Sequence, residues 1–372
     1  MDTDGIIAAA FELLAVPSTA DRPADLRRAL DFMIDFVGPG FTVEHFESGG
    51  KPSVLIYPGP RRRHFRIMLN AHVDVIPAAA EQFRPRIDDG RLYARGALDM
   101  KVSALMQALA FRDLATTVSY PLALQLVSDE EVGGRDGTLY QIEQGVSSDF
   151  VVIGEYSGLN VVTESKGLIV ATLHATGSAA HSAYPWLGDN ALVKLHESLA
   201  RLLAAYPVPA SEAWRTTINI ARVETTNHAY NQIPAQAQAL IDIRFTPEDP
   251  AFSRRTVPEI TAHLSSFCEA GVVPVVTHAS PPHRVDAGSP EIGRIRAAAE
   301  RQGYRSELLR RHGASDGRFY SQHGIDAAIF GIDGDGQHGA EEYADVTSIS
   351  AYYNALKDFL SDPGDARVTA RK

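Results

Sequence analysis

The chain has 372 residues, a length that accommodates two domains with separate cores, and its 45% hydrophobic and 22% charged residues are typical of a globular protein. With 46 acidic against 35 basic side chains, the formal net charge is -11, which argues against nucleic acid or an anionic membrane as a partner. The single cysteine, Cys268, excludes an intrachain disulfide and a cysteine-rich metal site.

The N-terminal segment is apolar but does not resemble an export signal. Its run from Ile6 to Val16 is interrupted by Glu12 and has no basic residues before it, which is typical of an amphipathic helix. No stretch of the sequence approaches the roughly twenty apolar residues that a membrane span needs. We therefore expect a cytoplasmic enzyme.

Hydrophobic periodicity and turn residues predict alternating helices and strands over the first 164 residues. Helices are expected at 4–15, 23–37, 100–114 and 137–144. Strands are expected at 41–46, 53–57, 64–70, 122–127 and 150–153. Within the second of these helices, Leu26, Leu30 and Met33 share one face. This alternation indicates an α/β fold.

The pattern changes near residue 165 and changes back near residue 280. Between them the expected order is strand, helix, strand, strand, helix, strand, at 167–176, 190–204, 217–223, 236–245, 253–268 and 272–277. This βαββαβ order predicts a small sheet with two helices on one face, inserted in the larger domain. Helices at 290–302 and 347–360, strands at 306–309 and 327–330, and a loop at 311–319 are expected after it. The expected domain limits are 1–164, 165–279 and 280–372, with disorder after Asp362.

Histidine and acidic side chains follow three of the expected strands. His72 and Asp74 are two residues apart, so in extended chain both point to the same side. Glu130 and Glu131 follow a second strand, and Glu155 follows a third. Polar loops at the carboxyl ends of strands are where open α/β sheets place their ligand sites.

These residue types suit metal-assisted chemistry. Because neighbouring side chains leave a loop in different directions, Glu131 or Glu130 can bind a metal while the other carries protons. A histidine with a carboxylate nearby suits an imidazole that binds metal and is oriented by a second residue. Simpler explanations are also open, because the acidic pair could be solvated and Asp99, just before a helix, could be an N-cap. The recurrence of such residues at three strand ends and one helix start favours a shared site.

Five stretches, in the order AHVDVIP, ARGALDMKV, SDEEVGG, GEYSG and GQHGAEEY, resemble the dinuclear zinc peptidase and deacylase family. This family includes succinyl-diaminopimelate desuccinylase, acetylornithine deacetylase, aminoacylase and glutamate carboxypeptidase. The similarity spans nearly the whole chain. It implies an α/β catalytic domain with a mixed central sheet flanked by helices, and an inserted α+β domain of βαββαβ order that acts as a lid and dimerisation domain.

The resemblance implies two zinc ions per chain, with one aspartate bridging them. By matching position, the ligands of one ion would be His72, Asp99 and Glu155. The ligands of the other would be Asp99, Glu131 and His338. This set of nitrogen and oxygen donors also suits cobalt or manganese.

Roles beyond the metal ligands also follow from the resemblance. Asp74 would orient His72, and Glu130 would be the general base. His181 in GSAAHSAYP matches the histidine that, in this family, reaches across a dimer interface to stabilise the tetrahedral oxyanion. A homodimer formed through the inserted domain is therefore expected. The open edge of its sheet could pair with a second copy, and closure by a hinge near residues 165 and 279 is expected.

Substrate contacts are expected from four residues. Asn231 in NQIP and Arg244 in DIRF resemble the family's polar and carboxylate-binding residues, and Arg244 could hold a substrate carboxylate through two hydrogen bonds. Lys166, near the hinge, is a further candidate, with a solvated surface group as its alternative. Ser315 in RHGASDGRF matches the desuccinylase pattern GGTSDGRF, but Ala314 stands where that pattern has threonine. A hydroxyl for a substrate carboxylate is therefore missing, and the acyl group stays open.

The expected activity is hydrolysis of the amide bond of an N-acyl amino acid or N-acyl diamino acid. A small-peptide carboxypeptidase or dipeptidase is the alternative within the family. A catalytically inactive scaffold of the same fold is the alternative from a different class.

Overall fold

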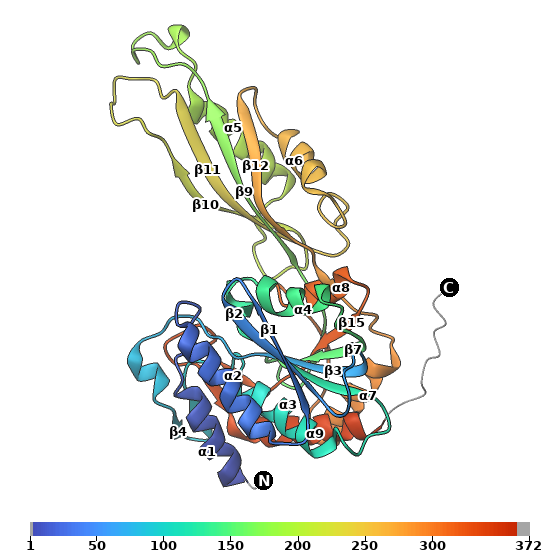
Figure 1. The fold of residues 1–372 in the computed structure, drawn as a ribbon. Helices are drawn as coiled ribbons and strands as arrows, with labels where there is room; N and C mark the ends of the chain where they lie inside the picture. The colour runs from blue at the N-terminus through green and yellow to red at the C-terminus, as the bar shows by residue number, and fades with distance from the viewer. Residues whose placement is uncertain (1–2, 363–372) are drawn as a thin grey trace. The chain divides into compact units, whose positions relative to one another are not determined.

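The computed structural model describes residues 3–362, so the expected disorder after Asp362 lies outside the described residues. The chain forms two compact units (Figure 1). The first contains the residues up to Thr163, Arg284–Leu309 and the residues from Ser315 onward, and the second contains Glu164–His283 and Arg310–Ala314. That the first unit is a catalytic domain and the second a lid stays a prediction.

The first unit is built on a nine-stranded mixed sheet. Its order is β1 (Thr42–Ser48), β2 (Lys51–Tyr57), β6 (Leu122–Val127), β3 (His64–His72), β7 (Ser147–Ile153), β15 (Asp326–Ile329), β8 (Val161–Ser165) and β13 (His283–Arg284), with β14 (Leu308–Arg311) also paired to β8. The four central strands β6, β3, β7 and β15 are parallel. Their carboxyl ends therefore meet at one edge of the sheet.

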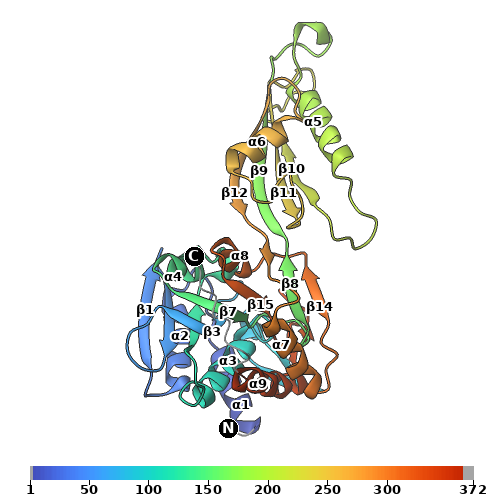
Figure 2. The same ribbon diagram turned by 90° about the vertical axis from the view of Figure 1, so that its right-hand side faces the viewer.

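Helices cover both faces of this sheet (Figure 2). On one face lie α1 (Thr3–Leu14), α2 (Pro23–Val37), α3 (Lys101–Leu114), α7 (Pro290–Arg301) and α9 (Val346–Ser361). On the other lie α4 (Tyr140–Glu143) and α8 (Gly317–Gln322). Because both faces are covered, most residues of the central strands are buried, and in β6 every residue is buried. The predicted α/β class with a mixed sheet flanked by helices is confirmed.

Helix α2 shows how local sequence sets these elements. Pro23 occupies its first turn, where the missing N–H costs nothing, and Gly38 follows its last residue with a positive φ of 84°. The predicted apolar face of Leu26, Leu30 and Met33 is buried. None of the described helices combines the length and the apolar character that crossing a membrane requires.

A small four-stranded sheet was not predicted. Its order is β16 (Gly334–Asp335), β17 (Tyr343–Asp345), β5 (Arg91–Tyr93) and β4 (Arg86–Asp88). Strands of two or three residues are too short to show a period of two in the sequence. The pairing of β17 with β5 matters for function, because it brings the GQHGAEEY turn next to the segment that precedes α3.

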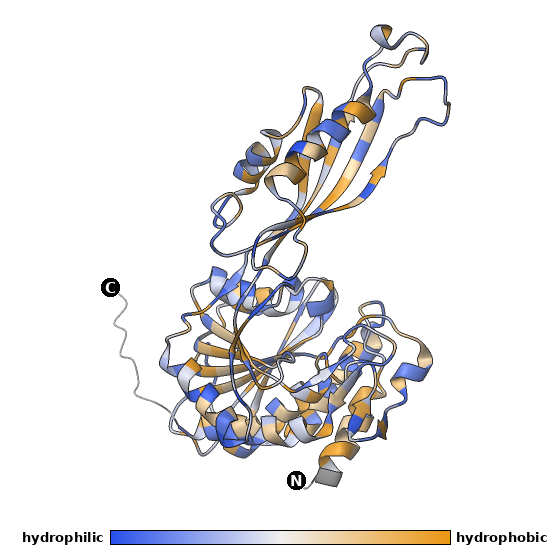
Figure 3. Ribbon diagram, turned by 180° about the vertical axis from the view of Figure 1, so that it is seen from behind, coloured by the Kyte–Doolittle hydropathy of each residue, from blue (hydrophilic) through white to orange (hydrophobic). Residues whose placement is uncertain are grey.

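The second unit has the predicted βαββαβ order. Its elements are β9 (Gly167–Thr176), α5 (Ala191–Ala205), β10 (Thr217–Glu224), β11 (Gln236–Phe245), α6 (Val257–Ser265) and β12 (Val272–Ser280). The strands form an antiparallel sheet of order β10-β11-β9-β12, and every second residue of β9 and β11 is buried against the helices. Figure 3 shows the resulting alternation of hydrophobic and hydrophilic residues along this unit.

Several elements differ from the prediction at their ends, and three of them show how. Helix α6 begins at Val257 rather than at 253, because the Glu259 carboxylate accepts hydrogen bonds from the backbone N–H and hydroxyl of Thr256 and fixes the helix start there. The helix expected at 137–144 is a π-helical turn, Arg135–Leu139, followed by the short α4. The loop expected at 311–319 runs into α8, which begins at Gly317.

Candidate metal centre

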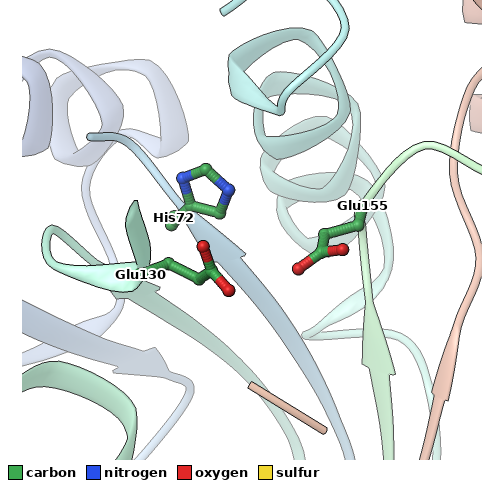
Figure 4. Close-up of side chains that lie close together, drawn as sticks. All are labelled: His72, Glu130 and Glu155. Carbon is green, nitrogen blue, oxygen red and sulfur yellow. The ribbon is translucent and has the colours of Figure 1, made fainter. Parts of the chain in front are cut away.

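Three side chains converge from the carboxyl ends of the parallel strands. His72 is the last residue of β3, Glu130 lies in the short helical turn after β6, and Glu155 lies just beyond β7. Each offers a ligand atom within 4.8 Å of the other two. Figure 4 shows the three side chains pointing toward one another. The sheet topology therefore brings together residues that are up to 83 positions apart in the chain.

A second group of donors comes from three other segments. Asp99 precedes α3, Glu131 follows Glu130 in the same turn, and His338 lies between β16 and β17. Their ligand atoms also lie within 4.8 Å of one another. His338 Nε2 is 3.3 Å from Glu131 Oε2. All five residues predicted as metal ligands, together with Glu130, thus fall into these two groups.

Asp99 lies between the two histidines. Its Oδ1 is 3.0 Å from Nε2 of His72, and its Oδ2 is 3.6 Å from Nε2 of His338. One oxygen toward each imidazole is the arrangement that a carboxylate shared by two metal ions requires. The alternative of an N-cap is wrong, because the cap position of α3 is Met100 and no side chain caps it. The bridging role of Asp99 stays a prediction.

Asp74 is buried and contacts both His72 and the acidic turn, Glu130–Val132, that follows β6. The Nδ1 of His72 lies 3.0 Å from the carbonyl oxygen of Asp74 and 3.5 Å from its Oδ1. Because a carbonyl oxygen only accepts hydrogen bonds, Nδ1 carries a proton, and Nε2 is the nitrogen that faces Asp99 and the site. Oδ2 of Asp74 accepts a hydrogen bond from the backbone N–H of Glu131 at 3.0 Å. This geometry suits the predicted orienting role.

Glu342 supports the site and was not identified from the sequence. Its side chain is fully buried and forms an ion pair with Arg95. Its Oε1 accepts three backbone hydrogen bonds at 2.9, 3.1 and 3.2 Å, donated by Gly96, Leu98 and Asp99. The carboxylate thus fixes the segment that carries Asp99. The pair of glutamates in GQHGAEEY was the available signal, but burial of the second could not be read from it.

Electrostatics indicate that the site is suited to cations. Burial raises the pKa of Glu131 to about 7 and that of Glu130 well above its ordinary range, with Glu155 adding to the second shift. Burial alone would raise the pKa of Asp99 too, but hydrogen bonds to His338 and His72 hold it well below its usual range.

These carboxylates and Asp74 outnumber the two imidazoles and the Arg318 guanidinium that act on them, so the cluster carries excess negative charge that buried cations would balance. The donors are nitrogen and oxygen atoms of the types that zinc, cobalt and manganese accept, arranged in two groups. The residues therefore fit two divalent ions.

In the second unit, His181 and Asn231 are exposed and line the same hollow of ≈ 410 Å³. The backbone N–H of Ser182 donates to the carbonyl of Asn231 at 2.9 Å, which holds the two loops together. Nδ1 of His181 accepts a hydrogen bond from the N–H of Ala183 at 3.1 Å. A neutral His181 therefore carries its proton on Nε2, as an oxyanion donor requires.

The other three substrate candidates have partners or burial that the sequence did not show. Arg244 donates two hydrogen bonds to Asp242, at 2.8 and 3.2 Å. Ser315 is buried, and its hydroxyl accepts a hydrogen bond from the N–H of Gly317 at 3.3 Å. Lys166 is only 1% exposed, so its alternative as a solvated surface group is wrong. The substrate roles of all three stay predictions.

A mixed sheet with two groups of candidate metal ligands near its carboxyl edge is the arrangement expected of a metal-dependent hydrolase. Residues 68–362 match peptidase family M20/M25/M40. The succinyl-diaminopimelate desuccinylase of Rhodospirillum centenum is 30% identical over 94% of this chain and 96% of its own length. The chain belongs to this peptidase family, which confirms the recognised resemblance and indicates the predicted enzyme class, a metal-dependent hydrolase.

Two further proteins show the range of relatives. A probable carboxypeptidase of Aspergillus terreus is 34% identical over 62% of this chain, and the match spans 59% of that relative's length. The crystal structure of a tripeptidase from Staphylococcus aureus superposes with a TM-score of 0.78, at 17% identity, over 98% of this chain and 99% of its own. The superposition with the tripeptidase shows that the two proteins share a fold.

Proposed function

We propose that the protein hydrolyses the amide bond of an N-acyl amino acid or N-acyl diamino acid with two zinc ions per chain. The observation that carries this proposal is the placement of Asp99 between His72 and His338, each within 3.6 Å of one of its oxygens. The desuccinylase relative, matched over nearly its whole length, supports a deacylase. The sequence alone leads us to expect a cytoplasmic enzyme.

The metal site would be filled by the two groups of donors. His72, Asp99 and Glu155 would hold one ion, and Asp99, Glu131 and His338 the other. When bound, the ions supply Lewis-acid polarisation of the scissile carbonyl and make the attacking water more acidic. Cobalt or manganese could substitute for zinc with the same ligands.

Glu130 would move the proton. Its carboxylate would remove a proton from the water that attacks the amide carbon, and would then deliver it to the leaving amine nitrogen as the C–N bond breaks. Burial and the neighbouring Glu155 raise the pKa of Glu130, which suits a carboxylate that must accept a proton from water. Asp74 would keep His72 in the tautomer that presents Nε2.

The second unit would supply the substrate contacts. His181, from the partner copy of a homodimer, would donate its Nε2–H to the oxyanion of the tetrahedral intermediate. Asn231, Arg244, Lys166 and Ser315 would contact the substrate. Arg244 would have to exchange its bonds to Asp242 for a substrate carboxylate.

The Glu130→Gln variant tests this proposal. Because Glu130 lies among His72 and Glu155, it could be a ligand instead of a base. As a base, its replacement should leave two metal ions per chain and reduce turnover of N-acyl amino acids by about a thousandfold. As a ligand, its replacement should reduce the metal content. The exposed Glu143 of α4, changed to glutamine, is the control that should alter neither.

A peptidase activity is the second candidate, because the probable carboxypeptidase of Aspergillus terreus has a higher identity over the region that it shares. Assays of acetyl, succinyl and formyl amino acids beside dipeptides and tripeptides separate the two activities. An inactive scaffold would hydrolyse none of them, and would bind fewer than two metal ions per chain.

A further inference from the structure

Lys166 is a buried cation without an anionic partner. It lies between β8 and β9 in the second unit, with 1% of its surface exposed. Its backbone N–H donates to the carbonyl of Arg311 at 3.1 Å. Among residues 3–362, its ammonium has no hydrogen-bond acceptor and no carboxylate within 4.0 Å. An ammonium in such a position is unfavourable unless something else supplies negative charge.

The groups around Lys166 are aromatic or positive. Its Nζ lies 5.8 Å from the centre of the Trp214 indole ring. The guanidinium of Arg310 lies 5.4 Å from the same ring, and the imidazole of His312 lies 5.7 Å from it. Burial lowers the pKa of Lys166, and the positive charge of Arg244 lowers it further. A cation–π contact compensates only part of the lost hydration.

The acidic residues nearby are already engaged. Glu164 lies 3.0 Å from the guanidinium of Arg310, and Glu212 lies 3.2 Å from the imidazole of His312. Trp214 adds a second unpaired donor, because its Nε1–H is buried and has no acceptor among the described residues. The cluster around Trp214 therefore offers donors without acceptors and carries one positive charge that no side chain balances.

We propose that Lys166 anchors a carboxylate-binding position in the second unit, against the indole of Trp214. One carboxylate group places one negative charge at the ammonium and balances the one unpaired charge, whereas a phosphate group would place about two negative charges there at neutral pH. The identity of the ligand rests on the proposed function, because N-acyl amino acids and peptides carry a free carboxylate beside the amide that is cut. The position would then select substrates with a free carboxylate over their neutral amides.

Binding can be measured without turnover. The chain has two tryptophans, Trp186 and Trp214, and Trp186 is 74% exposed. In a Trp186→Phe protein, loaded with metal, fluorescence reports on Trp214 alone. Titration with succinate at constant ionic strength should give a saturable change, whereas neutral succinamide should give none. Inorganic phosphate, tested in parallel, should bind at least about tenfold more weakly than succinate.

Variants of Lys166 assign the binding to this position. In the same background, Lys166→Met should weaken succinate binding by about tenfold or more, because a charge-assisted hydrogen bond is lost. Lys166→Arg should retain most of it. Lys194 of the same unit, whose charge is already paired with Asp189, is the matched control, and its change to methionine should have no effect.

Several results would overturn the proposal. Equal responses to succinate and succinamide would show that Lys166 is not the anchor. Binding of succinate by Lys166→Met as tight as by the parent would show the same. If Lys166→Met only lowered the melting temperature, with no succinate-dependent signal in the parent, the contact with Trp214 would be purely structural. Phosphate binding tighter than succinate would identify a different ligand class.

A kinetic measurement separates this proposal from the proposed function. With an N-acetyl amino acid, Lys166→Met should raise KM by about tenfold and change kcat much less. With the corresponding N-acetyl amino acid amide, which lacks the free carboxylate, Lys166→Met and the parent should have the same KM. If the parent hydrolyses neither compound yet binds succinate through Lys166, the proposed function fails and the carboxylate position stands. If it hydrolyses both equally well, the function stands and the selectivity fails.

Discussion

The two units hold their candidate residues in different ways. In the first unit, His72, Asp99 and Asp74 are buried, and each is fixed by at least one neighbour within 3.5 Å. In the second unit, His181 and Asn231 are exposed on loops. The first unit thus preorganises its donors by its own packing, whereas the second presents groups whose position relative to a substrate depends on what they meet. Four substitutions test this difference between the units.

The largest effect is expected from Asp99→Ala. It removes the carboxylate that, among residues 3–362, lies within 4.0 Å of both His72 and His338, and the two proposed metal ions would lose their shared ligand. Metal content should fall from two ions to one or none. Turnover should fall by about a thousandfold or more, because several kcal/mol of transition-state stabilisation are lost. Metal analysis and an N-acyl amino acid assay measure both. Asp88→Ala, on the exposed strand β4, is the control, and two retained ions in Asp99→Ala would refute the shared role.

The next effect should come from His181→Ala. Loss of an oxyanion donor should reduce kcat by about a hundredfold, with normal metal content and a small change in KM. His196→Ala, an exposed histidine on α5, is the matched control.

A mixing experiment tests whether His181 acts across a dimer. Glu130→Gln and His181→Ala chains are each nearly inactive, but a dimer of one of each would contain one complete site. Random reassortment of equal amounts should therefore restore about a quarter of the parent activity. No recovery, or a protein that light scattering shows to be an active monomer, would remove the role in trans.

A smaller effect, on the free energy of unfolding, should come from Gly134→Ala, just after the turn that carries Glu130 and Glu131. Gly134 has a φ of +64°, and a Cβ there would lie 2.1 Å from Oδ1 of the buried Asp316. The left-handed backbone and the clash together should cost about 2 to 4 kcal/mol of unfolding free energy. Gly145→Ala, with a φ of +88° and no atom within 4 Å, should cost only the backbone part. If urea denaturation showed the same loss of unfolding free energy for Gly134→Ala and Gly145→Ala, the contact between Gly134 and Asp316 would not be tightly packed.

The smallest effect is expected at the start of α6 in the second unit. Thr256→Ala removes the hydroxyl that donates to Glu259 and should cost about 1 kcal/mol. Hydrogen bonds from Thr256 lower the pKa of Glu259, so their stabilisation is present above the ordinary pKa and is lost as the pH falls through the lowered value. The difference between variant and parent in urea denaturation should therefore narrow below about pH 4.5. If the difference in unfolding free energy between Thr256→Ala and the parent did not change with pH, the ionised Glu259 would not contribute to the stability of this helix start.

Long elements with a regular pattern were predictable from the sequence. The limits of α2, β9 and β11 agree with the expectation, because each alternates or repeats its apolar residues over ten positions or more. The short strands β16 and β17 could not be predicted, because their pairing depends on contacts with segments far away in the chain.

Site residues divide in the same way. The strand-end histidine and acids could be found, because their residue types and order carry the chemistry. Burial could not be read from the sequence, which is why Glu342 was missed and Lys166 was given a solvated alternative. Whether Asp99 capped a helix or turned toward the histidines also depended on tertiary contacts. Local rules favour the cap, and only the convergence of three segments decides against it.

The second unit is made from two stretches of the gene, because Arg310–Ala314 belong to it as well as Glu164–His283. The carbonyl of Arg311 accepts a hydrogen bond from the backbone N–H of Lys166, so the short stretch borders the start of the long one. A chimera that exchanged only the long stretch with a relative would combine a Lys166 equivalent from one parent with Arg310 and His312 from the other. If Lys166 anchors the substrate carboxylate as proposed, the chimera would inherit the specificity of one parent only when both stretches are exchanged together.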